Sequence, residues 1–261
     1  MARPLLNRRR RGPVRRSPFH VFADLHTHTR HSHGTGSVLD NVRAAQRQGL
    51  EVVAITDHGP ASLFGVGVAG PAAFDAIRQE VIEARKAYPG VKVLWGAEAN
   101  VVSEDGELDI PPGLQERLDI VLAGLHPLVR WRSWAKGASL LAANAAGAWT
   151  GRVRHARERN TRAIVNAVLY NRVHVVTHPG YRLPIDTRAL AKACAATGCA
   201  LEINARHDHT TVEYIKIAKA EGARFALGSD AHSPERVGDL EKAVSLALEA
   251  GLASRDIVNA R

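Results

Sequence analysis

Cysteine, aromatic residues and long hydrophobic runs are all scarce in this 261-residue chain. The two cysteines, Cys194 and Cys199, match neither a C-x-x-C motif nor a zinc knuckle, which favours buried thiols in a reducing compartment. Aromatic residues make up 5% of the chain, so the core is expected to consist mainly of aliphatic side chains. No apolar run approaches the ~18 residues that cross a bilayer, and no apolar signal-peptide core follows the basic N-terminus. These absences predict a cytoplasmic protein without a membrane partner.

Positive charge is concentrated at the N-terminus. Seven arginines precede the first acidic residue, Asp24, and they account for most of the formal net charge of +9. Residues 1–18 also contain proline and glycine and cannot bury themselves, so we expect a disordered Arg-rich tail. Two interpretations of this tail stay open, since no aromatic residues are interleaved: weak contact with nucleic acid or another polyanion, and a solvated extension without a partner.

Seven short apolar segments are typical of buried parallel strands. They span residues 20–26, 51–56, 91–95, 120–125, 173–177, 200–203 and 224–227. Helical periodicity separates many of them, at about residues 37–49, 74–88, 164–169, 186–197, 211–221 and 234–250. This alternation predicts one α/β domain over residues 19–261, built as a closed or nearly closed seven-stranded β/α (TIM-like) barrel. The stretch of about 128–160 is too long for an ordinary connection and predicts an enlarged, partly helical insert.

Residues able to bind metal follow six of the seven predicted strands. His26 and His28 alternate along the first strand, so both imidazoles point to one face. An isolated H-x-H is a modest signal, but its recurrence at the carboxyl ends of later strands places the candidates on one rim of a barrel. The candidate metal ligands are His26, His28, His33, His58, Glu98, His126, His178, Asp230 and His232. Seven histidines and two carboxylates suit zinc, with manganese or iron(II) as alternatives, and nine ligands fit two or three ions.

The motifs at these strand ends resemble those of the PHP (polymerase and histidinol phosphatase) family. They are Asp24-Leu25-His26-Thr27-His28, Thr56-Asp57-His58-Gly59, Gly96-Ala97-Glu98, His126, Thr177-His178-Pro179-Gly180 and Ser229-Asp230-Ala231-His232. The resemblance covers the chain from about residue 19 to residue 250. It is closest to small stand-alone bacterial phosphatases with a three-zinc centre and a distorted seven-stranded barrel.

The resemblance also implies how the ligands divide among three zinc ions. The first ion would be bound by His26, His28, Glu98 and Asp230. The second would be bound by Glu98, His126 and His178, so that Glu98 bridges the two. The third would be bound by His33, His58 and His232. All nine positions are filled, which argues against a member that has lost its metal.

The predicted activity is hydrolysis of phosphomonoesters of small molecules by a metal-activated hydroxide at this trinuclear site, without a protein nucleophile. Asp24 and Asp57 are expected to orient imidazoles from behind the ligands. Arg206, His207 and Arg30 are expected to contact the substrate phosphate. An ordinary polar loop, or an ordinary turn aspartate, is the competing interpretation for each of these residues.

Three alternatives stay open at this point. A phosphodiesterase or 3′-5′ exonuclease acting on nucleic acid would use the same metals, and the Arg-rich tail and insert favour it. A nucleic-acid-binding or regulatory module would keep the metal for structure alone, although structural zinc sites are usually closed and rich in cysteine. A TIM-type amidohydrolase also begins with H-x-H on its first strand, but the later motifs match it less well.

Overall fold

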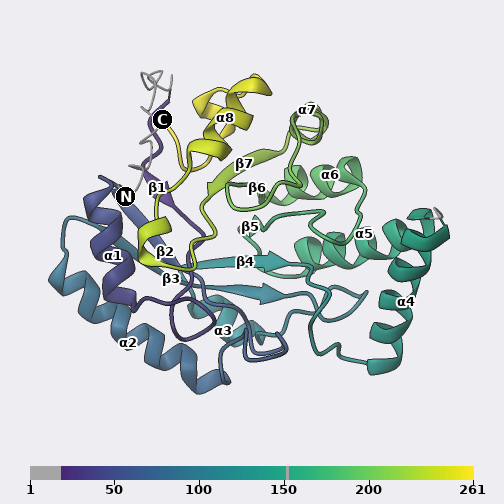
Figure 1. Ribbon diagram of the computed structural model, residues 1–261, viewed down its shortest axis with the longest axis horizontal. Coiled ribbons are helices and arrows are strands. Elements are labelled where there is room, and N and C mark those ends of the chain that lie inside the picture. The colour runs from purple at the N-terminus through teal and green to yellow at the C-terminus, as the bar shows by residue number, and fades with distance from the viewer. Residues whose placement is uncertain (1–18, 151–152) are drawn as a thin grey trace, which may run out of the picture.

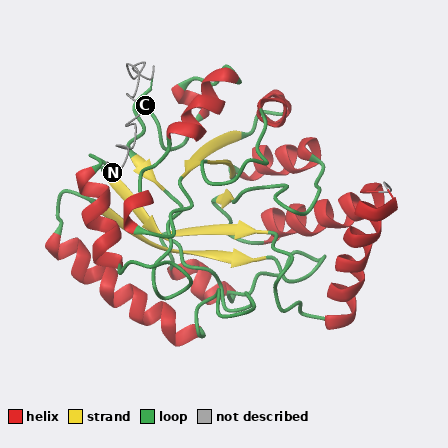
Figure 2. Cartoon of the chain, in the orientation of Figure 1, coloured by secondary structure: helices red, strands yellow, loops and turns green. Residues whose placement is uncertain are grey.

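Seven parallel strands stand at the centre of the fold, with helices outside them (Figure 1, Figure 2). The computed structural model describes residues 19–150 and 153–261, so the predicted tail of residues 1–18 lies outside the described residues. The strands follow one another in chain order within a single sheet. They are β1 (Ala23–Asp24), β2 (Val52–Ile55), β3 (Lys92–Asn100), β4 (Ile120–Gly124), β5 (Val175–Val176), β6 (Ala200–Asn204) and β7 (Arg224–Gly228).

Helices α1 to α7 lie in the connections between consecutive strands, as a β/α barrel requires, and α8 follows β7. They are α1 (Val38–Arg47), α2 (Pro71–Ala87), α3 (Pro112–Arg117), α4 (Trp134–Thr150), α5 (Val153–Tyr170), α6 (Thr187–Thr197), α7 (Val212–Ala220) and α8 (Glu241–Glu249). Three helices start at capping residues. The side chain of Ser37 accepts the N–H of Asp40, that of Asp186 the N–H of Ala189, and that of Thr211 the N–H of Tyr214. The predicted insert of about 128–160 contains α4 and the beginning of α5, which pack together through paired amides of Asn144 and Asn160.

The barrel is nearly closed, as the sequence predicted. At the carboxyl ends of the strands, Thr27 and Ala231 form a parallel bridge, and the N–H of His28 donates to the carbonyl of Ala231 at 2.8 Å. At the other end, the C-terminal segment lies between β1 and β7. There the buried amide of Asn259 donates to the carbonyls of Ala23 and Leu227, and it accepts the N–H of Leu227. Segments from both ends of the sequence therefore complete the wall.

Replacing Asn259 with alanine is expected to destabilise this seam. The change would leave two carbonyls and one N–H of β1 and β7 buried without partners, which costs about 2–4 kcal/mol in total. The free energy of unfolding in urea measures the effect. An unchanged urea midpoint would contradict this account of how the barrel closes.

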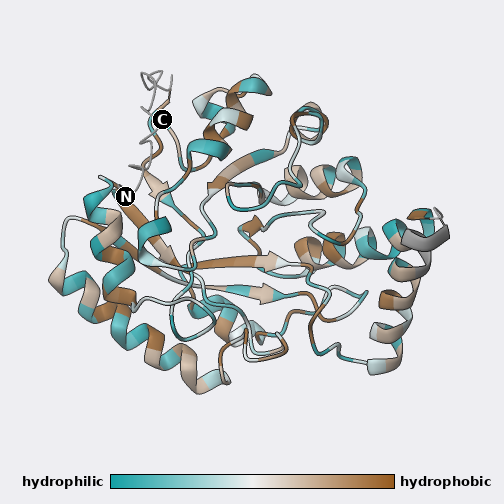
Figure 3. Ribbon diagram, in the orientation of Figure 1, coloured by the Kyte–Doolittle hydropathy of each residue, from teal (hydrophilic) through white to brown (hydrophobic). Residues whose placement is uncertain are grey.

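The interior of the barrel is apolar below the site. Six small and aliphatic side chains fill it: Ala54, Ile120, Leu122, Val175, Ala200 and Ala226. The strands are coloured mainly as hydrophobic, whereas the helices alternate between hydrophilic and hydrophobic positions (Figure 3). No described helix combines the length and the apolar character that crossing a bilayer requires. The low aromatic content thus matches a core of aliphatic residues.

Several predicted elements differ in extent, with β1 and β5 shorter than expected, and two differences bear on the site. The helix expected over residues 234–250 is interrupted, because a short 3₁₀ turn (Pro234–Arg236) precedes α8 and Gly238 between them adopts a left-handed φ of 78°. The N–H of Gly238 donates to Asp24, which fixes this break against β1. The third strand was predicted to end at Trp95, before Glu98, but β3 continues to Asn100 and places Glu98 inside the strand.

Candidate metal centre

The barrel interior becomes polar toward the carboxyl ends of the strands. Alternate residues of a strand face the same side, so Ala200 in the apolar layer is followed on that side by Glu202 and Asn204. Glu202 is 1% exposed, and Glu98 on β3 is fully buried. Charged side chains are rarely buried without partners, so this layer requires compensating groups.

Glu98 lies at the centre of the layer, and its Oε2 atom faces one group of imidazoles. The Nε2 atom of His26 is 3.3 Å from Oε2, and that of His28 is 3.6 Å away. The two ring nitrogens are 3.0 Å from each other. Asp230 completes the group, with its Oδ1 atom 3.4 Å from Nε2 of His28 and 3.9 Å from Nε2 of His26. These are the four residues predicted for the first ion.

The other oxygen of Glu98 faces a second group. Its Oε1 atom is 2.9 Å from Nε2 of His178 and 3.4 Å from Nε2 of His126. The two imidazole nitrogens are 3.3 Å apart. His178 has a left-handed φ of 27°, in the turn that follows β5. Glu98 therefore stands between two groups of ligand atoms, one on each oxygen, as a bridging carboxylate would.

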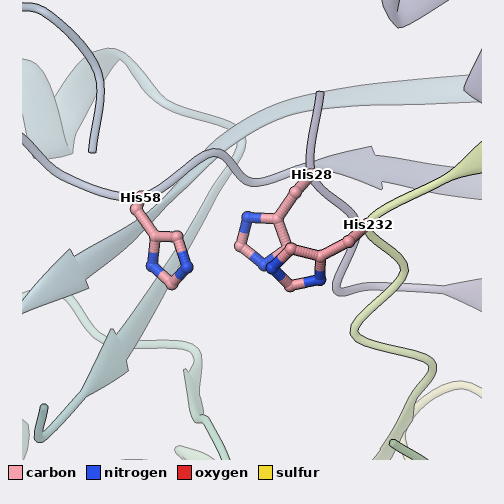
Figure 4. A group of neighbouring side chains, drawn as sticks. All are labelled: His28, His58 and His232. Carbon is pink, nitrogen blue, oxygen red and sulfur yellow. The ribbon is translucent and has the colours of Figure 1, made fainter. Parts of the chain in front are cut away.

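A third group of imidazoles lies next to the first. His28 and His232 have ring centroids 4.3 Å apart, and His28 stacks on His58 at 4.4 Å (Figure 4). His33 follows from the loop after β1, with its ring 4.0 Å from His232 and 5.0 Å from His58. His58 is also shared with the first groups, since its Nδ1 atom is 2.8 Å from Oε2 of Glu98. All nine predicted ligands thus converge on one end of the barrel.

The donor set fits metal ions on grounds internal to the structure. Three groups of side chains bring ligand atoms within 4.8 Å of one another: His28, His58 and His232; His26, His28 and Glu98; His58, Glu98 and His126. Among the described residues, Oε2 of Glu98 has no partner in hydrogen-bond geometry, despite its contact with His58. A fully buried carboxylate oxygen without such a bond is costly, and a cation would compensate it.

The electrostatics keep both carboxylates and His28 in the forms that bind metal. Burial alone would raise the pKa of Glu98, but His58, His26 and His126 together hold it well below its usual value. The same opposition holds the pKa of Asp230 well below its usual value, with burial countered by His26, His207 and His232. Burial and the neighbouring His58 lower the pKa of His28 well below its ordinary value. Burial opposes charge on His26 and His178 as well, but Glu98 and Glu202 outweigh it and raise the pKa of both imidazoles. Ionised carboxylates and a neutral imidazole are the states that metal binding needs.

Two residues that the sequence did not single out orient the imidazoles. Oε1 of Glu202 is 2.7 Å from Nδ1 of His26, and its Oε2 atom accepts the N–H of His178 at 2.6 Å. Oδ1 of Asn100 is 2.7 Å from Nδ1 of His126. Each contact leaves the Nε2 atom of its imidazole turned toward Glu98. A signal for Glu202 was present, because a glutamate inside the apolar run 200–203 needs a buried partner.

Replacing Glu202 with glutamine is expected to lower zinc affinity and kcat/KM by about 10–100-fold, the usual effect of removing a carboxylate behind a metal-binding histidine. Competition with a fluorescent chelator measures the affinity. Glu213→Gln, at an exposed position on α7, is the matched control and should behave as the native protein. Native zinc affinity in the Glu202 variant would rule out the orienting role.

Among the described residues, the hydrogen-bond partners of Asp24 and Asp57 are backbone N–H and hydroxyl groups, not the imidazoles that the sequence suggested. The Asp24 carboxylate accepts the hydroxyl and N–H of Ser229 and the N–H of Gly238, so it joins β1 to the chain after β7. The Asp57 carboxylate accepts the N–H and hydroxyl of Thr29 and the hydroxyl of Ser32. Both carboxylates therefore hold the backbone of loops that carry candidate ligands, rather than the imidazoles themselves.

Of the three residues predicted to contact the substrate phosphate, two line a cavity at the site and one does not. Arg206 and His207 line a cavity of about 240 Å³ that opens onto the histidines. The guanidinium of Arg206 contacts His232 and lies 3.4 Å from Oδ1 of Asp230, while Nε2 of His207 is 3.2 Å from the other oxygen of Asp230. Arg30 is not among the lining residues, since its guanidinium pairs with Glu80. The first loop is therefore held away from the cavity at this position.

Comparisons with known proteins identify relatives over most of the chain. The model of the PHP domain matches residues 24–229. A probable phosphatase of Thermoanaerobacter sp. (strain X514) is 32% identical over 251 residues, covering 92% of this chain and 90% of the relative. A probable phosphatase of Tolumonas auensis is 36% identical over 228 residues, covering 84% of this chain and 81% of the relative.

A solved structure shows the same fold. The histidinol phosphate phosphatase of Lactococcus lactis, determined with zinc, L-histidinol and phosphate, superposes with a TM-score of 0.59. The match covers 89% of this chain and 95% of that protein. The sequences are 15% identical, so the likeness is one of fold.

Proposed function

This chain belongs to the PHP domain family as a phosphoesterase, and we propose that it hydrolyses phosphomonoesters of small molecules with metal ions held at the histidine-rich end of its barrel. The observation that carries the proposal is Glu98, whose two oxygens face separate groups of imidazoles in a fully buried position. The relatives named as probable phosphatases, and the phosphatase fold of the Lactococcus lactis protein, support the same reaction.

We assign the ligands as three sets around Glu98. His26, His28 and Asp230 would share the first ion with Oε2 of Glu98. His126 and His178 would share the second with Oε1. A third ion would take His33, His58 and His232. Zinc suits this set of imidazoles and carboxylates, with manganese and iron(II) as the alternatives.

Bound ions at such a site supply a water nucleophile that is active near neutral pH, and positive charge for the phosphoryl oxygens. The side chains of the protein orient the imidazoles and the substrate phosphate. Glu202 and Asn100 fix the tautomers of His26 and His126, so that Nε2 faces the centre. Arg206 projects into the cavity from beside Asp230 and His232, where its guanidinium can donate to a phosphoryl oxygen. Nucleophilic attack by a protein side chain is not required.

The competing diesterase or exonuclease function receives less support. The described bases of the predicted insert do not line the cavity that opens onto the histidines. Four of them pair with carboxylates outside this cavity. The pairs are Arg132–Glu107, Lys136–Asp105, Arg154–Glu158 and Arg159–Glu104. Contact of the tail with nucleic acid concerns residues 1–18, which lie outside the described residues.

Release of inorganic phosphate by purified, zinc-loaded protein tests the proposed function. A panel of small phosphomonoesters, with an aryl phosphate as the generic member, is expected to be hydrolysed by protein that carries close to three zinc ions per chain. Metal-loaded protein that releases no phosphate from any member would contradict the proposal. Folded protein that binds no metal would contradict it as well.

A further inference from the structure

The mouth of the metal-site cavity has an apolar wall. Two segments build it: residues 62–66, which follow the candidate ligand His58, and residues 127–129, which follow the candidate ligand His126. They pair as antiparallel backbone, through a bridge between Ser62 and Val129 and a hydrogen bond from the N–H of Leu63 to the carbonyl of Leu128 at 3.1 Å. This pairing makes the wall an ordered part of the fold.

The side chains on this wall are large, apolar and exposed. Phe64 is 84% exposed and Leu128 is 52% exposed, and both line the cavity together with Leu63, Val66 and Pro127. Phe64 adopts a left-handed φ of 60°, which a bulky residue rarely takes. A strained backbone that presents an aromatic ring to solvent at the mouth of a site is difficult to explain by packing, because nothing covers the ring among the described residues.

A second aromatic surface faces the same cavity from another loop. Tyr181 stacks on His207, with ring centroids 3.9 Å apart and an interplanar angle of 19°. Arg182 lies over the Tyr181 ring at 5.0 Å and has no carboxylate partner among the described residues. The cavity therefore combines aromatic rings from two loops with two cationic side chains, Arg182 and Arg206.

The distribution of charge decides how a substrate would lie. Arg206 is next to His232 and Asp230, where a phosphate would be held, and Arg182 lines the same cavity beside Tyr181. The five residues of the apolar wall carry no charge, so they suit the part of the substrate that is not phosphate. The volume of about 240 Å³ is small for a ligand site and accommodates little more than a phosphate and one ring system.

We propose that the substrate is a phosphomonoester whose alcohol carries an uncharged aromatic ring, packed against Phe64, Leu63 and Leu128. This inference rests on the proposed function and adds the chemical class of the leaving group. An aromatic ring gains binding free energy from burial against Leu63 and Leu128 and from ring–ring contact with Phe64. The rest of the wall acts by excluding water around the ring.

Binding of two phosphonates to zinc-loaded protein tests the inference without turnover. Benzylphosphonate is expected to bind at least about tenfold more tightly than methylphosphonate in isothermal titration, because only the first reaches the wall. The ratio should fall at least threefold in Phe64→Asn, which tolerates the left-handed backbone, and in Leu128→Ala. Trp134→Ala removes an aromatic ring that is 83% exposed outside the cavity, and it should leave the ratio unchanged.

Equal binding of the two phosphonates, binding of neither, or a ratio unaffected in both variants would overturn the inference. Turnover separates this failure from that of the proposed function. 2-Phenylethyl phosphate and ethyl phosphate release alcohols of similar pKa, so a difference in kcat/KM reports contact with the ring. Hydrolysis of both without preference would overturn the inference and leave the proposed function standing. Tighter binding of the aromatic phosphonate, with hydrolysis of neither ester, would support the inference and overturn the proposed function.

Discussion

Glu98→Gln is expected to abolish most of the activity, with a loss in kcat/KM of about three orders of magnitude or more. Glutamine has nearly the same shape as glutamate but lacks the charge that faces imidazoles on both sides. In place of one carboxylate oxygen it presents an NH₂ group, which cannot bind a cation. The variant is therefore expected to lose bound zinc together with activity.

Steady-state kinetics and the zinc content of the purified variant measure this effect together. Glu83→Gln, at an exposed position on α2, provides the matched control and is expected to retain both. Thermal unfolding shows whether the variant is folded. Native zinc content and native kcat/KM in Glu98→Gln would show that this carboxylate does not bridge ions.

Removal of metal is expected to inactivate the protein and to lower its Tm. The ligands converge in a buried layer, so ions bind the folded state far better than the unfolded one. At zinc concentrations of about 1,000 times Kd, one site contributes about 4 kcal/mol, or roughly 10 °C in Tm for a chain of this size. Zinc added back to the stripped protein should restore both activity and Tm.

Differential scanning calorimetry with and without a chelator measures the shift. The Glu98→Gln variant is an internal control, since a protein that has already lost its central ligand should respond little to the chelator. A stripped protein that keeps its activity, or a Tm that is indifferent to zinc in the native protein, would exclude a metal-dependent mechanism.

The convergence of the candidate ligands could be predicted because the pattern that places them is local. Alternation puts His26 and His28 on one face of a strand, and a parallel barrel brings the carboxyl ends of its strands to one rim. His58, His126 and His178 follow the same rule on other strands. The predicted fold is confirmed, and the family model matches the chain over residues 24–229.

The partners of the supporting residues could not be predicted because they depend on contacts between segments that are distant in the sequence. Glu202 contacts His26 across 176 residues of sequence, and Asp24 accepts from Ser229 across 205. Asp24 lies two residues before the candidate ligand His26, which made an imidazole partner plausible, yet its carboxylate joins β1 to the chain after β7. The position of Arg30 could not be predicted for the same reason. Its guanidinium pairs with Glu80 on α2, and Arg30 does not line the cavity.

The most direct test of the central claim is a paired assay of zinc-loaded protein on an aryl phosphomonoester and the corresponding bis-aryl diester, with Glu98→Gln run beside it to exclude contaminants. We expect the monoester to be hydrolysed with the higher kcat/KM, and this activity to disappear in the variant. A higher kcat/KM for the diester, or monoester hydrolysis that persists in Glu98→Gln, would contradict a phosphomonoesterase centred on Glu98.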